Sequence, residues 1–338
     1  MNLPETQQDE HFDQVLKVIQ QAKSRVLSAA NTQLLELYWQ LGEYLSLKVS
    51  KQGWGKSTVK QLSHWLAERE PNLRGFSAQN LWRMRQFYET YAQQPKLSTV
   101  LRELPWSSHL HLMSKCQTNE EREFYLKTAI KERWSVRELE KQINKALFER
   151  TITSPTKVSS LLRELHPAAE SIFKDNYLFD FLHLPEPYHE RDLQQGLIKH
   201  LKQFLMELGR DFCFIGQEFS IQVGQKDFSI DLLFFHRELQ ALVAFELKID
   251  DFKPAYLGQL EFYLEALDRD HRKPHEAASI GILLCKNRDH DVVEYALSRS
   301  LSPTLVAQYQ TRLPDKALLQ AKLEEFYELT KREREHEE

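Results

Sequence analysis

Hydrophobic residues recur at helical spacing through the first half of the chain and alternate or form short unbroken runs through the second. The first half predicts helices over 12–49, with a break at Asn31-Thr32, and over 57–70, 77–91, 118–126 and 135–148, plus one that begins at Trp106. The second half predicts strands over 212–223, 228–235, 241–249, 280–285 and 304–309, with helices over 188–208, 254–267 and 290–300. We therefore expect an all-helical domain followed by an α/β domain.

Segment boundaries follow from composition. The segment TITSPTK (151–157) is polar and contains Pro155, which is typical of a linker. The predicted organisation is a helical domain over 10–150, a linker over 151–172, an α/β domain over 173–313 and a charged C-terminal helix over 314–338. At 338 residues the chain is long enough for two domains that each bury a core.

Two neighbouring strands carry charges inside apolar runs. FSIDLLFF (228–235) and ALVAFELKI (241–249) flank the polar segment RELQ (237–240), which fits a four-residue hairpin loop. If the hairpin closes symmetrically, Asp231 lies opposite Glu246. Because side chains alternate across a strand, Glu246 and Lys248 share one face, while Phe245, Leu247 and Ile249 share the apolar face.

This charge cluster needs compensation, because burying unpaired charge is costly. A divalent ion between Asp231 and Glu246 would supply it, and hard oxygen ligands suit Mg²⁺ or Mn²⁺. The ion would polarise a phosphodiester and activate water, and Lys248 would orient that water or stabilise charge on the phosphate. The alternative is an ion pair on a half-exposed hairpin, since a Glu-x-Lys motif alone is very common.

Longer motifs resemble a known family. The run IDLLFFHRELQALVAFELKIDDFKPAYLGQLEFYLEALD (230–268) is similar to the nuclease core of YhcG-type PD-(D/E)XK proteins, and SIGILLCK (279–286) continues the similarity. Upstream, GFSAQNLWRMRQFYETY (75–91) and WSVRELEKQINKALFER (134–150) resemble the N-terminal domain of that family. The resemblance covers nearly the whole chain. It implies a restriction-endonuclease-like fold for the α/β domain.

The resemblance also implies an activity, which is Mg²⁺-dependent hydrolysis of DNA in restriction, mobile-element defence, repair or recombination. It implies that Gln259 and Tyr263, four residues apart on one helix, face the active site. The first helix of this fold often adds an acidic metal ligand, for which Glu190 is the candidate. Related sequences often carry glutamate where this chain has Gln194, so the role of that helix stays open. Nucleases of this fold commonly act as dimers, so a homodimer is one expected state.

Residues 56–85 fit a helix-turn-helix-like element that binds nucleic acid. Two predicted helices flank the turn PNLRG (71–75). Residues 56–85 contain six basic and two acidic side chains. The candidate phosphate-contacting and base-reading residues are Lys56, Lys60, Arg74, Gln79, Asn80, Arg83 and Arg85. Docking of a protein partner is the competing interpretation, because two helices and a turn occur in most helical domains.

Charge and cysteine content bear on the partner and on the cellular compartment of the protein. The first 150 residues carry 22 basic and 17 acidic side chains, whereas the whole chain has a formal net charge of −4. A mildly basic front half suits contact with nucleic acid. The polar start MNLPETQQDE, three scattered cysteines and the lack of an 18-residue apolar run predict a cytoplasmic protein without membrane contact. The rival functions are a catalytically inactive DNA-binding module and a protein-interaction adaptor.

Overall fold

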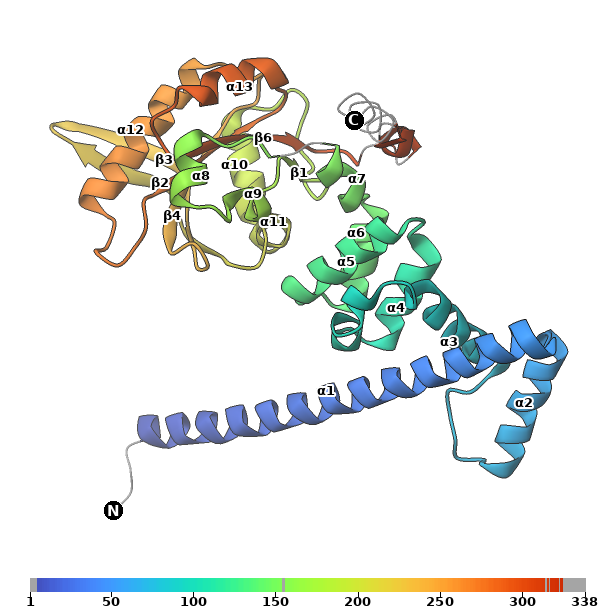
Figure 1. Cartoon of the computed structure of the whole chain (residues 1–338). Coiled ribbons are helices and arrows are strands. Elements are labelled where there is room, and N and C mark those ends of the chain that lie inside the picture. The colour runs from blue at the N-terminus through green and yellow to red at the C-terminus, as the bar shows by residue number, and fades with distance from the viewer. Residues whose placement is uncertain (1–4, 154–155, 314, 316, 322, 325–338) are drawn as a thin grey trace. The chain divides into compact units, whose positions relative to one another are not determined.

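Two compact units make up the chain, Met1–Asn144 and Lys145–Glu338. The computed structural model describes residues 5–153, 156–313, 315, 317–321 and 323–324, without the side chains of residues 5–11, 13 and 24. The described elements of the first unit are all helices, and the second unit is built on a six-stranded sheet (Figure 1). The expected fold class, a helical domain followed by an α/β domain, is confirmed.

The first unit begins with one long helix. Its elements are α1 (Glu5–Gln52), α2 (Lys56–Arg69), α3 (Ala78–Tyr91), the 3₁₀ turns η1 (Pro95–Leu97) and η2 (Val100–Glu103), α4 (Trp106–Lys115), α5 (Asn119–Lys131) and α6 (Val136–Asn144). The break predicted at Asn31-Thr32 is wrong, because α1 runs through it. The Asn31 side-chain amide donates to the carbonyl oxygens of Arg102 and Leu104, so it ties α1 to the η2 turn and does not end the helix.

Helices α1 and α3 approach closely at a glycine. A β-carbon at Gly42 would lie 2.2 Å from the Met84 carbonyl oxygen, so only glycine fits there. Ser77 caps α3, as predicted, by accepting a hydrogen bond from the Asn80 backbone N–H. The connection 70–77 is longer than the three or four residues typical of a helix-turn-helix, so the DNA-reading interpretation stays a prediction.

Besides helical residues at 317–321 and 323–324, the described part of the second unit has three short helices, the sheet and four longer helices. Its elements are α7 (Leu147–Ile152), α8 (Ser160–Leu165), α9 (Ala169–Ile172), β1 (Asn176–Leu178), α10 (Glu190–Lys199), α11 (Leu201–Leu208), β2 (Phe212–Val223), β3 (Lys226–His236), β4 (Ala241–Leu247), α12 (Ala255–Asp270), β5 (Ile280–Cys285), α13 (His290–Ser298) and β6 (Thr304–Gln310). The sheet order is β1-β6-β5-β4-β3-β2. Strands β2, β3 and β4 are antiparallel neighbours, whereas β4, β5, β6 and β1 run parallel.

Helices cover both faces of this sheet. One core joins the sheet to α8, α9, α10 and α11, and the other joins it to α12 and α13 (Figure 1). A β-carbon at Gly281 would lie 2.8 Å from Leu260, so glycine lets α12 pack directly on β5. Strand β4 is therefore buried along its whole length, and the charged face of the predicted hairpin is not half-exposed.

Three further expectations differ from the structure. The helix predicted over 188–208 is divided at His200, whose φ of −110° and ψ of 34° separate α10 from α11. Strand β1 was not predicted, because its three residues are ordered by pairing with the distant β6. Part of the predicted linker packs on the sheet, since Val158 is buried and bridges Leu305. Most of the predicted helix over 314–338 lies outside the described residues.

Candidate active site

The predicted hairpin brings two carboxylates together. His236 pairs with Ala241, which leaves the four-residue loop 237–240, and the last pair along the ladder is Leu232 with Phe245. The next position on each strand is Asp231 and Glu246, so the two carboxylates are in register on adjacent strands. The backbone N–H of Leu247 donates to Asp231 Oδ2 at 2.8 Å and fixes this carboxylate beside β4.

Glu246 is buried with one oxygen unsatisfied. Its side chain is 3% exposed, Oε1 accepts a hydrogen bond from Lys248 Nζ at 3.0 Å, and Oε2 has no hydrogen-bond partner among the described residues. Burial raises the pKa of Glu246 to about 7, and the nearby charge of Asp231 adds to the rise. An orphaned carboxylate oxygen beside a second carboxylate is the arrangement that a bound cation would relieve.

Lys248 stays charged despite its burial. Burial lowers its pKa, but the charge of Glu246 and the hydrogen bond to it raise the pKa more, so the pKa lies above its ordinary value. The ammonium also lies 3.4 Å from Glu190 Oε2 and 5.4 Å from the centre of the Tyr256 ring. Lys248 therefore brings a positive charge to the site.

Asp231 sits among several acidic neighbours. Burial raises its pKa, the Leu247 N–H and the charge of Lys248 lower it, and the charges of Glu190 and Glu218 raise it. The net direction is upward, so the folded chain disfavours ionisation of both carboxylates in the absence of a cation.

Helix α10 contributes to the site in two ways. Glu190, its first residue, is 46% exposed and reaches Lys248, so it lies at the edge of the cluster. Gln194 is buried, and its Nε2 donates to the Asp231 carbonyl oxygen at 3.0 Å. The departure from glutamate at position 194 therefore places a neutral side chain that holds β3 against α10.

Gln259 and Tyr263 lie one turn apart on helix α12 and contact each other. Gln259 Nε2 donates to the Tyr263 hydroxyl at 2.6 Å. Burial raises the pKa of Tyr263, and the charges of Glu246 and Asp231 contribute to that rise, which puts this hydroxyl near the carboxylates. Tyr263 is therefore a neutral hydroxyl beside the acidic pair.

One site neighbour was not identified from the sequence. Glu218 lies in β2 between the pairs Gln217–Leu232 and Phe219–Ile230, so it is in register with Asp231. Its φ of 44° is positive, a conformation that costs a non-glycine residue about 1–3 kcal/mol. The alternating pattern of β2 gives no signal for this backbone conformation, so only the structure reveals it.

The donor set suits a hard divalent ion with few protein ligands. Among the described residues, no group of three or more His, Cys, Asp and Glu side chains is arranged to hold a metal. Asp231 and Glu246 form a pair, and Mg²⁺ is usually held by one or two carboxylates together with water and substrate phosphate. The orphaned Glu246 Oε2 fits that mode of binding, whereas Glu190 is engaged with Lys248.

Comparison with known proteins identifies the family of the chain. The family described as "YhcG PDDEXK nuclease domain" matches residues 170–324, and the "DUF1016 N-terminal domain" matches residues 14–150. "Putative nuclease YhcG" of Escherichia coli (strain K12) is 30% identical over an alignment of 359 residues, gaps included. The alignment covers 93% of this chain and 95% of that protein. This chain belongs to the YhcG family of PD-(D/E)XK nucleases.

Solved structures also share similarity with this YhcG family member. A repair endonuclease from Pyrococcus abyssi is 16% identical, with a TM-score of 0.25 over 39% of this chain and 50% of that one. The apo form of EndoMS is 16% identical, with a TM-score of 0.24 over 39% of this chain and 49% of that one. The chain thus spans about half the length of each of these proteins. None of its described helices is long and apolar enough to cross a bilayer.

The residues predicted to contact DNA differ in availability. Lys56, Lys60, Arg74 and Gln79 are exposed, and Arg83 is half-buried. Arg85 is held by Glu89 at 2.7 Å and lies over the Trp82 ring.

Asn80 has a structural role that competes with base reading. Its side chain donates to the Gly75 carbonyl oxygen and accepts from Trp106 Nε1 at 3.1 Å. It therefore ties the start of α3 to the 70–77 connection and to α4. These internal hydrogen bonds use the amide groups that reading a base would require.

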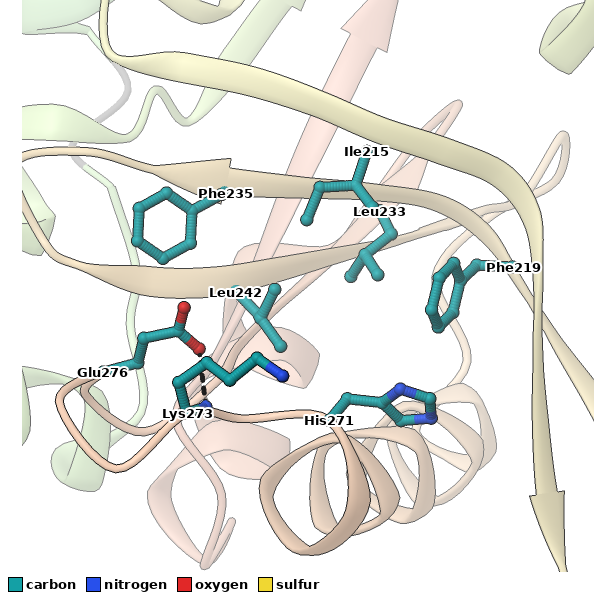
Figure 2. Close-up of a pocket in the computed structure, with 8 residues that line it drawn as sticks. All are labelled: Ile215, Phe219, Leu233, Phe235, Leu242, His271, Lys273 and Glu276. Atoms are coloured by element: carbon teal, nitrogen blue, oxygen red, sulfur yellow. Dashed lines mark hydrogen bonds between the residues drawn. The ribbon is translucent and has the colours of Figure 1, made fainter.

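A cavity in the second unit of this YhcG-family chain is lined by neither Asp231 nor Glu246. Its volume is about 310 Å³, and Figure 2 shows its lining: Ile215, Phe219, Leu233, Phe235, Leu242, His271, Lys273 and Glu276. Leu233 lies two residues along β3 from Asp231. Most residues that line the cavity are apolar, and Glu276 is the single carboxylate among them. Glu276 accepts a hydrogen bond from the backbone N–H of Lys273, so the cavity offers no pair of carboxylates.

Proposed function

We propose that this chain is a Mg²⁺-dependent nuclease that hydrolyses phosphodiester bonds of DNA. One observation carries the proposal: Asp231 and Glu246 are in register on adjacent strands, with the buried Glu246 Oε2 unpartnered and the Lys248 ammonium 3.0 Å from Glu246 Oε1. Membership of the YhcG family supports the reaction class.

Asp231 and Glu246 would hold the metal, which is Mg²⁺ or Mn²⁺ in this proposal. Bound there, such an ion supplies a Lewis acid for the phosphodiester and lowers the pKa of a coordinated water. The chain prepares its ligands in advance, because Leu247 N–H fixes Asp231 and Gln194 holds the backbone of the same residue. This second layer of hydrogen bonds orients the carboxylates before substrate arrives.

Lys248 supplies fixed positive charge at the reacting centre. Its raised pKa keeps the ammonium protonated near neutral pH, so it orients water and stabilises negative charge on the phosphate, and does not remove a proton. Glu190 reaches the same ammonium from α10 and aims it. We assign Glu190 this positioning role and keep direct metal ligation for Asp231 and Glu246.

Gln259 and Tyr263 border the site from α12. Their hydrogen bond of 2.6 Å orients the neutral Tyr263 hydroxyl, which can donate to a phosphate oxygen or to the attacking water.

The helical unit would present the substrate. The exposed Lys56, Lys60 and Arg74 and the half-buried Arg83 are suited to contact phosphates, while Asn80 and Arg85 are engaged internally. Docking of a protein partner is the alternative role of this unit. We place the enzyme in the cytoplasm, in DNA restriction, mobile-element defence, repair or recombination, by analogy with its family.

A substrate panel tests the proposal. Full-length protein freed of metal is offered linear duplex, branched and single-stranded DNA, and RNA, with and without Mg²⁺. We expect cleavage of at least one DNA substrate only with the ion, and none by Asp231→Asn. Metal-independent cleavage, or unchanged cleavage by Asp231→Asn, would refute the proposal. Salt-dependent DNA binding without cleavage in any condition would indicate an inactive binding module.

A further inference from the structure

A second lysine lies at the edge of the sheet that carries Lys248. Strands β4 and β5 are parallel neighbours, so both end at this edge. The backbone N–H of Lys248 donates to the Leu284 carbonyl oxygen at 2.8 Å. Lys286, the first residue after β5, donates its own N–H to the Asp250 carbonyl oxygen at 3.2 Å. Because adjacent strands lie ~4.8 Å apart, the backbones of the two lysines are close neighbours.

The turn into α10 holds both ammonium groups. Glu190 Oε2, in the first residue of α10, lies 3.4 Å from the Nζ atom of Lys248. Two residues earlier in the chain, the centre of the Tyr188 ring lies 5.4 Å from the Nζ atom of Lys286. That distance is within the range of a cation–π interaction, which keeps the ammonium over the ring. Lys248 and Lys286 are therefore held at the same end of α10.

The Tyr188 ring is itself fixed in place. It is half-buried and packs against the core that the sheet shares with α10. Its hydroxyl lies 3.3 Å from the hydroxyl of Tyr309, a residue of β6 that is 1% exposed. A ring anchored in this way gives Lys286 a rigid support, so the ammonium loses less conformational freedom when it binds an anion.

The side chain of Lys286 is exposed and has no acidic partner among the described residues. Other basic residues near this edge are neutralised within the chain. Lys253 forms an ion pair with Asp250. Arg288 is buried against Asp175. A fixed, exposed and unpaired ammonium is suited to an anion that comes from outside the chain.

We propose that Lys286 binds a phosphate of the substrate strand next to the phosphate that lies at Asp231 and Glu246. This assignment rests on the proposed nuclease function, which supplies the phosphodiester strand. Each strand of DNA carries a phosphate every ~3.4 Å of rise, so a strand with one phosphate at the carboxylates brings the next one close to the end of β5. The two carboxylates repel that neighbouring charge, and the ammonium of Lys286 offsets the repulsion.

The two lysines then have different tasks. Lys248 lies at the reacting phosphate and lowers the barrier to hydrolysis. Lys286 touches a phosphate that does not react, so it binds substrate and transition state equally. Loss of Lys286 therefore lowers affinity for DNA and leaves the chemical step intact.

DNA binding by the full-length protein tests the contact without any need for cleavage. Fluorescence anisotropy with a short duplex, in buffer with Ca²⁺, measures affinity over a range of salt concentrations. Lys286→Gln should weaken binding about tenfold and reduce the slope of log affinity against log salt by about 0.9. Lys286→Arg keeps the positive charge and should keep the wild-type slope.

The matched control removes the same charge from the other end of α10. Lys199 is exposed in the last turn of that helix, ~14 Å from Glu190 at 1.5 Å per residue. Lys199→Gln should therefore leave affinity and salt slope at their wild-type values. A wild-type slope in Lys286→Gln, or an equal loss in Lys199→Gln, would overturn the proposal.

Kinetics and a neutral linkage locate the contact on a cleaved substrate. Lys286→Gln should raise KM about tenfold and leave kcat within about twofold of wild type. A single methylphosphonate linkage on one side of the cleaved bond should weaken binding by wild type and not by Lys286→Gln, because both changes remove the same contact. Equal weakening of both proteins by linkages on either side would refute the contact. If no DNA is cleaved, the nuclease proposal fails, and the salt slope still decides whether Lys286 binds a phosphate.

Discussion

Replacing Glu246 with glutamine removes one negative charge from a buried site and should change how stability depends on pH. The pKa of this carboxyl rises from 4.5 to about 7 on folding, mainly because of burial. The folded chain therefore binds a proton more tightly than the unfolded chain does. Stability from this group is fully present below pH 4.5 and is lost as pH rises to about 7.

The expected magnitude follows from that difference in pKa. Between pH 4.5 and about 7, ionisation of Glu246 should cost the folded wild type about 3 kcal/mol. For a unit of this size that corresponds to about 6–12 °C in melting temperature. Glu246→Gln is neutral throughout and should lack this loss, and its amide oxygen can still accept the hydrogen bond from Lys248.

Calorimetry between pH 5 and pH 8 in the presence of a chelator measures the effect. All six tryptophans lie between Trp39 and Trp134, so tryptophan fluorescence follows the first unit alone and separates its melting from that of the second. Glu238→Gln, an exposed change in the loop of the same hairpin, is the matched control. If Glu246→Gln keeps the wild-type pH dependence of the second transition, the account of a buried, proton-binding Glu246 is wrong.

Further predictions concern residues in both units. Lys248→Ala should slow cleavage ~100- to 1,000-fold while DNA binding persists, and Lys248→Arg should restore little because a planar guanidinium does not replace a compact charge; single-turnover rates decide this. Reversing the charge of Lys56 and Lys60 should reduce the slope of log affinity against log salt by about 0.9 for each lost phosphate contact, as fluorescence anisotropy would show. Asn80→Ala should destabilise the first unit by about 1–3 kcal/mol, followed by tryptophan fluorescence, without changing DNA affinity.

Much of the site could be predicted because its residues are close in sequence. The apolar runs bounded by polar turns gave β2 and β5 their observed limits, Phe212–Val223 and Ile280–Cys285. A symmetric four-residue loop was enough to put Asp231 in register with Glu246. Local pattern and alternation therefore specify this part of the site.

Features that depend on distant contacts could not be predicted. Gln194 looked like a departure from the family pattern, and only its hydrogen bond to the Asp231 carbonyl oxygen shows why a neutral side chain fits. Asn31 looked like a helix break until its partners in the 100–104 region were known. The positive φ of Glu218 leaves no trace in residue type.

The central claim is that Asp231 and Glu246 hold a metal ion that drives hydrolysis. The single-turnover rate of DNA cleavage at saturating Mg²⁺, compared between Glu246→Gln and Glu238→Gln, tests it most directly. Loss of several kcal/mol of charge stabilisation should make Glu246→Gln at least ~100-fold slower than wild type, while Glu238→Gln should match wild type. Wild-type rates in Glu246→Gln would contradict the assignment of the site.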